Sequence, residues 1–298
     1  MRPFILALAT LLLFGCGSAQ QASIALYNPY SGSEGTVMDF IKSAPPDEVY
    51  KDTNFKVGVT LWNKGAIDVN DAVVSLSFLD KYFRIQPDKR TGVALKGKSI
   101  IRRSGEKKTV FFDAFAREAA YDLSTPITAT LCYSYITRMV DEVCVDPDIY
   151  GLEPRQKACA PKDLVLRDQG APVAVTGVEQ SLVEEGSSVR VYEKITLKNL
   201  GTGLVANTYG SAGQLCSSSL STDVLNRVRV HAELGGRRMD CGPSGGDVTV
   251  KLEAGVAQTT CSAVIQPRNE YVTPLKVELF YGYSDTLPQK QVIILPSP

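Results

Sequence analysis

The residues best suited to catalysis are a single histidine, His231, and a Gly-Pro-Ser-Gly-Gly run at residues 242–246. One histidine excludes any site that needs two imidazoles and leaves a nucleophile without an obvious base. The run matches the Gly-x-Ser-x-Gly pattern of a nucleophile elbow, but that motif needs a helix after the serine and a later histidine. Here a strand pattern follows, and the histidine comes first. We therefore expect a β-turn at 242–246, a solvent-facing His231 on a strand, and no catalytic residue.

Metal and cofactor sites are also weakly indicated. Carboxylates occur in loop-forming sequence at residues 68–71 (Asp-Val-Asn-Asp) and 146–148 (Asp-Pro-Asp), but neither has the spacing of a dedicated calcium loop. The cysteines lack the Cys-x-x-Cys spacing of zinc sites, and no glycine-rich phosphate loop opens a helix. The sequence predicts no bound metal and no cofactor.

The N-terminal segment, residues 1–16, has the pattern of an export signal. Arg2 is followed by an uncharged, mostly apolar run at residues 3–15, which is too short to span a bilayer stably. The Leu-Phe-Gly-Cys end of this run resembles the lipobox of prokaryotic lipoproteins, which implies cleavage before Cys16 and a lipid on that cysteine. The alternative is an ordinary secretory signal cleaved after Ala19. We expect an exported protein held to the outer face of a membrane by a lipid on Cys16.

The overall charge excludes one class of partner. Lysine plus arginine and aspartate plus glutamate number 32 each, so the chain has no net basic field for nucleic acid. Beyond Cys16, six cysteines remain, and an even number in an exported chain predicts three disulfides: Cys132, Cys144, Cys159, Cys216, Cys241 and Cys261.

A strand pair that occurs twice organises the chain. Residues 125–135 (Thr-Pro-Ile-Thr-Ala-Thr-Leu-Cys-Tyr-Ser-Tyr) return 148 residues later as 273–283 (Thr-Pro-Leu-Lys-Val-Glu-Leu-Phe-Tyr-Gly-Tyr). Each copy is expected to turn back into a second apolar strand, 140–145 or 289–295, and so to close its half of the chain with a hairpin. The Tyr-x-Tyr ends place two rings on one face of each strand. They could bind sugars, but we favour core packing for at least one ring of each pair.

About seven short strands in each half predict an all-β protein with two tandem sandwich domains. Only residues 114–120 have a weak helical pattern. The expected order is a signal peptide at 1–16, a tether at 17–35, a sandwich at 36–150, a Pro-rich joint at 151–170 and a second sandwich at 171–298.

Asn-x-Gly turns at residues 63–65 and 199–201, a later strand led by glycine and a closing hairpin resemble the CARDB-like and fibronectin type III-like modules of prokaryotic surface proteins. The Pro-Pro, Asn-Lys-Gly and Cys-Val-Asp-Pro-Asp stretches look like those of uncharacterised archaeal surface proteins. The resemblance covers roughly residues 36–145 and 171–298. It implies Ig-like sandwiches used for adhesion, spacing or assembly, without shared catalytic residues.

The repeat also suggests a disulfide pairing. Cys132 and Cys144 fall on opposite strands of the first predicted hairpin, where the second copy has the apolar residues Phe280 and Val292. This correspondence favours a Cys132–Cys144 bridge. For the other four cysteines we favour Cys241 with Cys261 and Cys159 with Cys216.

The sequence therefore favours a non-enzymatic, membrane-anchored surface protein that presents two Ig-like domains to a protein or glycan partner. One alternative is a carbohydrate-binding accessory protein or an extracellular enzyme with a site on its loops. Another is a structural subunit of an envelope assembly, in which edge strands pair with neighbours.

Overall fold

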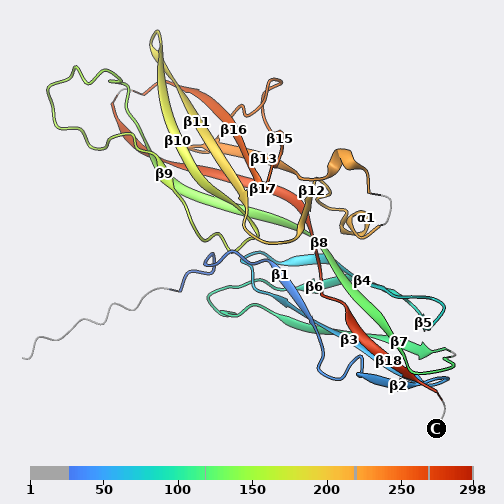
Figure 1. Cartoon of the computed structure of the whole chain (residues 1–298). Coiled ribbons are helices and arrows are strands. Elements are labelled where there is room, and N and C mark those ends of the chain that lie inside the picture. The colour runs from blue at the N-terminus through green and yellow to red at the C-terminus, as the bar shows by residue number, and fades with distance from the viewer. Residues whose placement is uncertain (1–26, 118, 218–219, 268, 297–298) are drawn as a thin grey trace, which may run out of the picture.

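The computed structural model describes residues 27–117, 119–217, 220–267 and 269–296. The leader, Cys16 and residues 17–26 of the tether lie outside this part of the chain. Within it the protein is built almost entirely from strands, as the sequence predicts, with a short helix α1 (Ala212–Leu215) and a 3-10 turn at Thr222–Val224. The strands form two four-stranded sheets and one ten-stranded sheet (Figure 1). The all-β sandwich class is confirmed.

The first four-stranded sheet packs with part of the large sheet to form lobe 1. Its strands alternate buried apolar and exposed polar residues, as β3 does with Phe55, Val57, Val59 and Leu61 pointing inward. The order in this sheet is β1 (Thr36–Phe40), β3 (Asn54–Asn63), β7 (Lys107–Ala116) and β5 (Phe83–Ile85). The facing layer contains β6 (Lys89–Leu95), β4 (Val69–Ser77), the first half of β8 (Leu123–Val145), β18 (Lys290–Leu295) and β2 (Glu48–Tyr50).

Lobe 2 repeats this arrangement with the second half of the chain. Its four-stranded sheet has the order β16 (Val256–Ile265), β11 (Ser188–Asn199), β10 (Val173–Glu185) and β9 (Leu164–Val165). The facing layer contains β15 (Val248–Lys251), β14 (Arg237–Arg238), β13 (Arg227–Leu234), β17 (Tyr271–Thr286) and the second half of β8, with β12 (Leu204–Ala206) beside β17.

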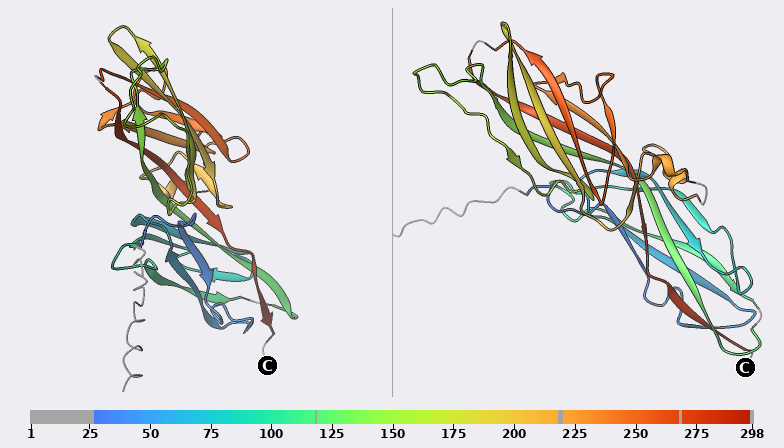
Figure 2. Two further views of the ribbon diagram at one scale, coloured as in Figure 1. Left: turned by 90° about the vertical axis from the view of Figure 1, so that its left-hand side faces the viewer. Right: turned by 45° about the horizontal axis from the view of Figure 1, so that its top comes forward.

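Two strands run through both lobes and exchange their ends. β8 is one continuous strand of 23 residues, and it pairs with β4 and β18 in lobe 1 before pairing with β17 in lobe 2. β17 returns along β8, and β18 then lies in lobe 1, antiparallel to β8 and parallel to β2 (Figure 2). The last strand of each repeat thus completes the lobe of the other repeat.

This exchange corrects the predicted hairpins and domain boundaries. The chain does not turn back before residue 140, so residues 136–145 belong to lobe 2, and residues 290–295 belong to lobe 1. The predicted sandwiches at 36–150 and 171–298 therefore each lose their last strand to the other. The two repeats have similar strands, and the exchange of equivalent strands between two similar lobes resembles domain swapping within one chain.

The register of the exchanged strands reveals a pseudo-twofold axis. Ser134 of β8 pairs with Gly282 of β17, and these two residues occupy equivalent positions in the repeats, 148 residues apart. On either side of this pair, Tyr133 lies opposite Tyr283 and Tyr135 opposite Tyr281. The two Tyr-x-Tyr motifs therefore meet at the point where the lobes join.

Residues 114–116 complete β7 instead of forming the expected helical turn, because Ala114 and Ala116 alternate inward on the strand.

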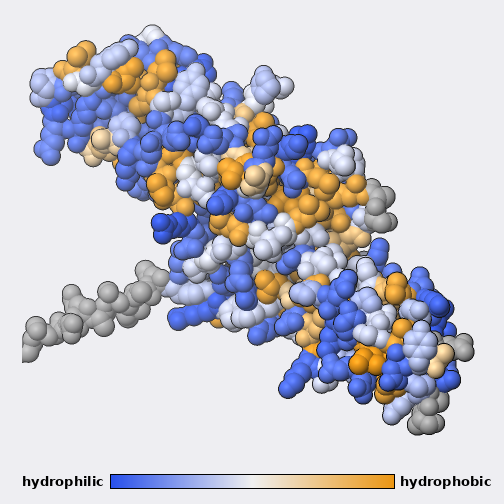
Figure 3. Space-filling model, in the orientation of Figure 1, coloured by the Kyte–Doolittle hydropathy of each residue, from blue (hydrophilic) through white to orange (hydrophobic). Residues whose placement is uncertain are grey.

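The surface seen in Figure 3 is largely hydrophilic, with apolar residues gathered in the region of α1 and β12.

Candidate functional site

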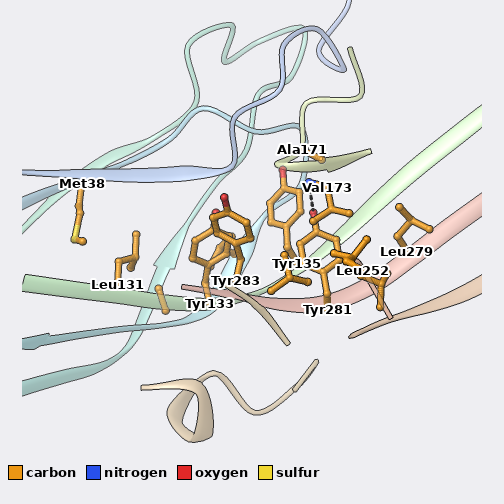
Figure 4. Packing of buried hydrophobic residues seen from close by; sticks show 14 of the residues in the cluster. Met38, Leu131, Tyr133, Tyr135, Ala171, Val173, Leu252, Leu279, Tyr281 and Tyr283 are labelled. Atoms are coloured by element: carbon orange, nitrogen blue, oxygen red, sulfur yellow. Dashed lines mark hydrogen bonds between the residues drawn. The ribbon is translucent and has the colours of Figure 1, made fainter. Parts of the chain in front are cut away.

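Four tyrosines form the centre of the junction between the lobes. Tyr133 and Tyr135 of β8 and Tyr281 and Tyr283 of β17 are all buried. Ring centroids lie 5.8 Å apart for Tyr133 and Tyr283 and 6.2 Å apart for Tyr135 and Tyr281. The side chains project from the strand pair toward the same side (Figure 4). Core packing of the Tyr-x-Tyr motifs is confirmed, and these rings are not available to stack on a sugar.

Each tyrosine hydroxyl accepts a hydrogen bond from a backbone amide, in the same pattern in both repeats. Thr36 N donates to Tyr133 (3.2 Å) and Val173 N to Tyr281 (3.3 Å). The amides of Ile67 and Gly203 donate to Tyr135 (3.2 Å) and Tyr283 (2.8 Å), respectively. Burial raises the pKa of all four phenols, so the hydroxyls stay protonated.

A protonated hydroxyl also donates, and Tyr135 donates to the carbonyl of Gly170 in the joint (2.7 Å). The phenol thus connects β8, the turn before β4 and the segment that leads into β10. Buried polar groups cost free energy unless they are paired, so these bonds fix where the turns lie against the crossing strands.

The Asn-x-Gly turns noted in the sequence lead directly to the amides that bind two of these tyrosines, Tyr135 and Tyr283. Asn63 accepts from Gly65 N (3.0 Å) and donates to Ile67 O (2.8 Å). Asn199 does the same with Gly201 N (3.2 Å) and Gly203 O (3.0 Å). These bonds shape each turn so that the amide of Ile67 faces the Tyr135 phenol and the amide of Gly203 faces the Tyr283 phenol.

Glycine is required at the third position of both turns by a close approach. A Cβ atom at Gly65 would lie 1.9 Å from the Tyr135 hydroxyl, and one at Gly201 would lie 2.2 Å from the Tyr283 hydroxyl. The two motifs of the repeat, Asn-x-Gly and Tyr-x-Tyr, therefore form one interlocking contact in each lobe.

The opposite face of the junction is covered by the segment that contains α1. Leu215 and Ala206 pack on Cys132 of β8, and Cys132 forms a disulfide with Cys216 at the end of α1. A Cβ atom at Gly282 would lie 2.1 Å from Thr208 Oγ1 in the same segment. The crossing strands are thus fixed on one face by tyrosines and on the other by a covalent bond.

Two of the three favoured disulfide pairs were wrong. The structure joins Cys132 to Cys216 and Cys144 to Cys159, whereas Cys241 is bonded to Cys261 as favoured. Cys132 and Cys144 are 12 residues apart on one extended strand. At about 3.3 Å per residue they are separated by about 40 Å, far beyond the reach of a disulfide. The error follows directly from the predicted hairpin.

Charged groups in the joint bind those that directly precede it. Lys157 Nζ lies 2.6 Å from Asp146 and 2.9 Å from Asp148, so an ammonium group occupies the place where a calcium ion was considered. Hydrogen bonds from the backbone amide of Glu153 and from Lys157 lower the pKa of Asp148 to about 2. With the Cys144–Cys159 disulfide, these contacts hold the joint against lobe 2.

A bidentate pair adds a second fixed point in the joint. Arg155 contacts both carboxylate oxygens of Glu270 (2.7 and 2.5 Å), which also accepts from Ala158 N (2.8 Å). The arginine bonds and the amide bond lower the pKa of Glu270 to about 2. At residues 68–71, Asp68 is likewise paired with Lys96 (2.7 Å). Over the described residues no group of three or more potential ligands could hold a metal ion.

His231 lies on the outer face of β13, as its sequence phase predicts, but it is not free in solvent. Its Nδ1 lies 2.7 Å from Asp247 and its Nε2 2.9 Å from Glu233, and Arg238 also contacts Asp247 (2.8 Å). Burial opposes the charge on the imidazole, but the bonds to Glu233 and Asp247 outweigh it and raise the pKa. The histidine binds the following loop to β13.

That loop contains the Gly-x-Ser-x-Gly pattern, and it is the β-turn that the sequence predicts. Gly245 N donates to Gly242 O (3.0 Å), and a strand, β15, follows the turn. No helix follows Ser244, so the structural context of a nucleophile elbow is absent from this part of the described chain.

Glu193 is a buried acid that the sequence did not single out. Glu193 is fully buried on β11, where it takes the inward phase between Val191 and Ile195. Gln180 donates to one carboxylate oxygen (2.8 Å), and the other oxygen has no partner within the described residues. Burial raises the pKa of Glu193 to about 7. A charged residue at an inward position of an alternating strand was the available signal.

Comparison with known proteins gives no family for this chain. No protein family and no curated protein matches it. Among solved structures, similarity extends to the secreted serine protease VesC from Vibrio cholerae, with 10% identity, a TM-score of 0.23, and coverage of 89% of this chain and 52% of that one. This chain thus spans about half of that protease's length.

Two other structures share the same low similarity. Red sea bream transglutaminase has 10% identity and a TM-score of 0.17 over 89% of this chain and 32% of its own. The CupB6 tip adhesin from Pseudomonas aeruginosa has 12% identity and a TM-score of 0.16 over 89% and 97%. These scores support no functional argument. Within the described residues, no helix is long and apolar enough to cross a membrane.

Proposed function

We propose that this protein is an exported, non-enzymatic envelope protein, anchored by a lipid on Cys16, whose two Ig-like lobes present a surface to a protein or glycan partner. The observation that carries this proposal is the strand exchange. β8 and β17 pair continuously from Tyr271 with Val145 to Thr286 with Thr130. Lobes joined in this way keep a fixed orientation, which suits a spacer or presenting scaffold.

Two further observations support export and a scaffold role. All six cysteines in the described chain form disulfides, which persist in oxidising compartments. The polar groups at the junction and the joint are engaged in structural contacts, so the most elaborate side-chain networks serve to hold the fold. The leader pattern at residues 1–16 supports export from the cytoplasm.

The anchor is tested by the Cys16→Ser variant, with Ser18→Ala as a matched control two residues away. We expect fatty-acid labelling and membrane retention in the wild type and in Ser18→Ala, and an unprocessed or released protein for Cys16→Ser. Normal processing and undiminished fatty-acid labelling of Cys16→Ser would reject the lipid anchor.

The partner is tested by cross-linking the native protein in its envelope, in parallel with a polysaccharide pull-down. A specific cross-linked protein supports a protein-presenting scaffold. Retention by polysaccharide without a protein partner favours the carbohydrate-binding alternative. Regular oligomers of this chain in size-exclusion chromatography favour the envelope subunit.

A further inference from the structure

The loop between β6 and β7 presents two isoleucines to solvent. Ile100 is 74% exposed and Ile101 is 99% exposed, so almost nothing in the described fold contacts the second side chain. The residues on either side bind each other, since Ser99 N donates to Arg102 O (2.9 Å) and Arg102 N donates to Ser99 Oγ (2.9 Å). The isoleucines therefore occupy the tip of a closed turn.

This choice of residues is unfavourable for a free loop. Turn tips in water are normally built from Gly, Asn, Asp, Pro or Ser, whereas β-branched apolar residues lose hydrophobic burial there. One exposed apolar residue needs no explanation, but an adjacent pair on a hydrogen-bonded tip forms a projecting apolar wedge. A wedge of this kind fits an apolar environment outside the folded chain.

The residues that flank the wedge in sequence are basic, although the carboxylates of Asp68 and Glu106 lie within electrostatic range of Arg102. Residues 96–104 contain four basic residues and no acidic one. Lys96 is paired with Asp68, whereas Arg102 and Arg103 form no ion pair with any residue that the structure describes. An apolar tip with basic flanks matches the chemistry of a membrane interface with anionic headgroups.

The loop also lies where the chain leaves toward its N-terminus. Tyr27, the first described residue, donates its hydroxyl to Arg103 O, and its ring lies 5.4 Å from the Arg103 guanidinium. Lys98 Nζ donates to Ser31 O. Figures 1 and 2 show the loop after β6 on the same side of the molecule as the start of the described chain.

The length of the preceding chain keeps the loop near the proposed anchor. Cys16 precedes Tyr27 by 11 residues. Even fully extended, this stretch spans at most about 40 Å. A lipid on Cys16 would hold residues 96–104 within that distance of the bilayer.

We propose that residues 96–104 form a second membrane contact, in which Ile100 and Ile101 enter the interface and the basic residues bind anionic headgroups. The proposal rests on the membrane location given under the proposed function. Two contacts, a lipid and a loop, would fix the orientation of the lobes relative to the bilayer, which a single flexible tether cannot do.

The test uses residues 17–298, without the leader and Cys16, because a leader or a lipid would bind vesicles by itself. This chain contains the whole described fold and all three disulfides. Co-sedimentation is measured with phosphatidylcholine vesicles and with vesicles that also contain phosphatidylglycerol. We expect binding to the anionic vesicles that weakens with salt.

The variants separate the apolar and the charged contributions. Ile100→Ser with Ile101→Ser is expected to weaken binding by about tenfold or more, and Arg102→Gln by about fivefold. Tyr150→Ser with Leu152→Ser, a joint variant at the start of that segment, removes two similarly exposed apolar side chains, 71% and 79% exposed, and is expected to leave binding unchanged. Circular dichroism verifies that each variant is folded.

Failure of this inference is distinct from failure of the anchor. No binding of folded wild-type protein to anionic vesicles, or equal loss in the joint variant, would overturn the loop contact and favour a protein partner for the wedge. Neither result affects the Cys16→Ser experiment. Conversely, a protein without a lipid at Cys16 would still bind vesicles through this loop if the inference is correct.

Discussion

The exchange of strands predicts that a substitution in the last strand, β18, destabilises lobe 1, although the other strands of that lobe come from the first half of the chain. Ile294 is fully buried in lobe 1, where it lies opposite Leu123 of β8 and Val49 of β2. Ile294→Ala removes three buried carbons and leaves a cavity, at a cost of about 3 kcal/mol. This free energy corresponds to about 100-fold faster amide exchange for strands that open with lobe 1.

Hydrogen–deuterium exchange measured by mass spectrometry locates the effect. Ile294→Ala is expected to accelerate exchange in β2 (Glu48–Tyr50) more than in β13 (Arg227–Leu234). Val143→Ala is the matched control, because Val143 comes from the first repeat but is buried on the part of β8 that pairs with β17. Its effect should be larger in β13. Faster exchange in β13 but not in β2 for Ile294→Ala would refute the exchange and restore the hairpin.

Three further predictions follow. The free energy of unfolding should fall by about 3 kcal/mol as the pH rises from the unfolded pKa of Glu193, 4.5, to its folded pKa of about 7, because the protonated acid is favoured in the fold. Glu193→Gln should flatten this slope and be more stable than the wild type in urea titrations at pH 8; an unchanged slope would contradict this. Gly65→Ala should lower the free energy of unfolding by about 2 kcal/mol or more, because the new Cβ atom displaces the Tyr135 hydroxyl. Gly213→Ala has open space around it and should cause no such loss. Equal urea midpoints for the two variants would contradict the contact. Peptide mapping without reduction should recover a peptide that links Cys132 to Cys216, and a Cys132–Cys144 peptide would contradict the structure.

Much of the fold could be predicted from local sequence. The alternation of Phe55, Val57, Val59 and Leu61 identified β3, and similar patterns identified most of the other long strands, because the side-chain period of a strand is local. Turn chemistry at residues 242–246 was also predictable, since glycine and proline restrict the backbone where they stand.

The candidate site was only partly predictable. The sequence indicated that the Tyr-x-Tyr motifs pack in a core, but not that Tyr135 and Tyr281 belong to one cluster, because they are 146 residues apart. The role of the Asn-x-Gly turns was hidden for the same reason, since each turn meets its tyrosine only in the folded protein. Glu193 was overlooked although its phase on the strand was visible.

The sequence by itself determined most of the long strands, the repeat and the six cysteines available for disulfides, because each depends on residue types and short spacings. Only the tertiary structure decided which repeat completes which lobe. The two strand pairs share the same apolar alternation, so local preferences do not distinguish a hairpin from an exchange. The long-range contacts of the junction select between them, and the disulfide pairing follows from that choice.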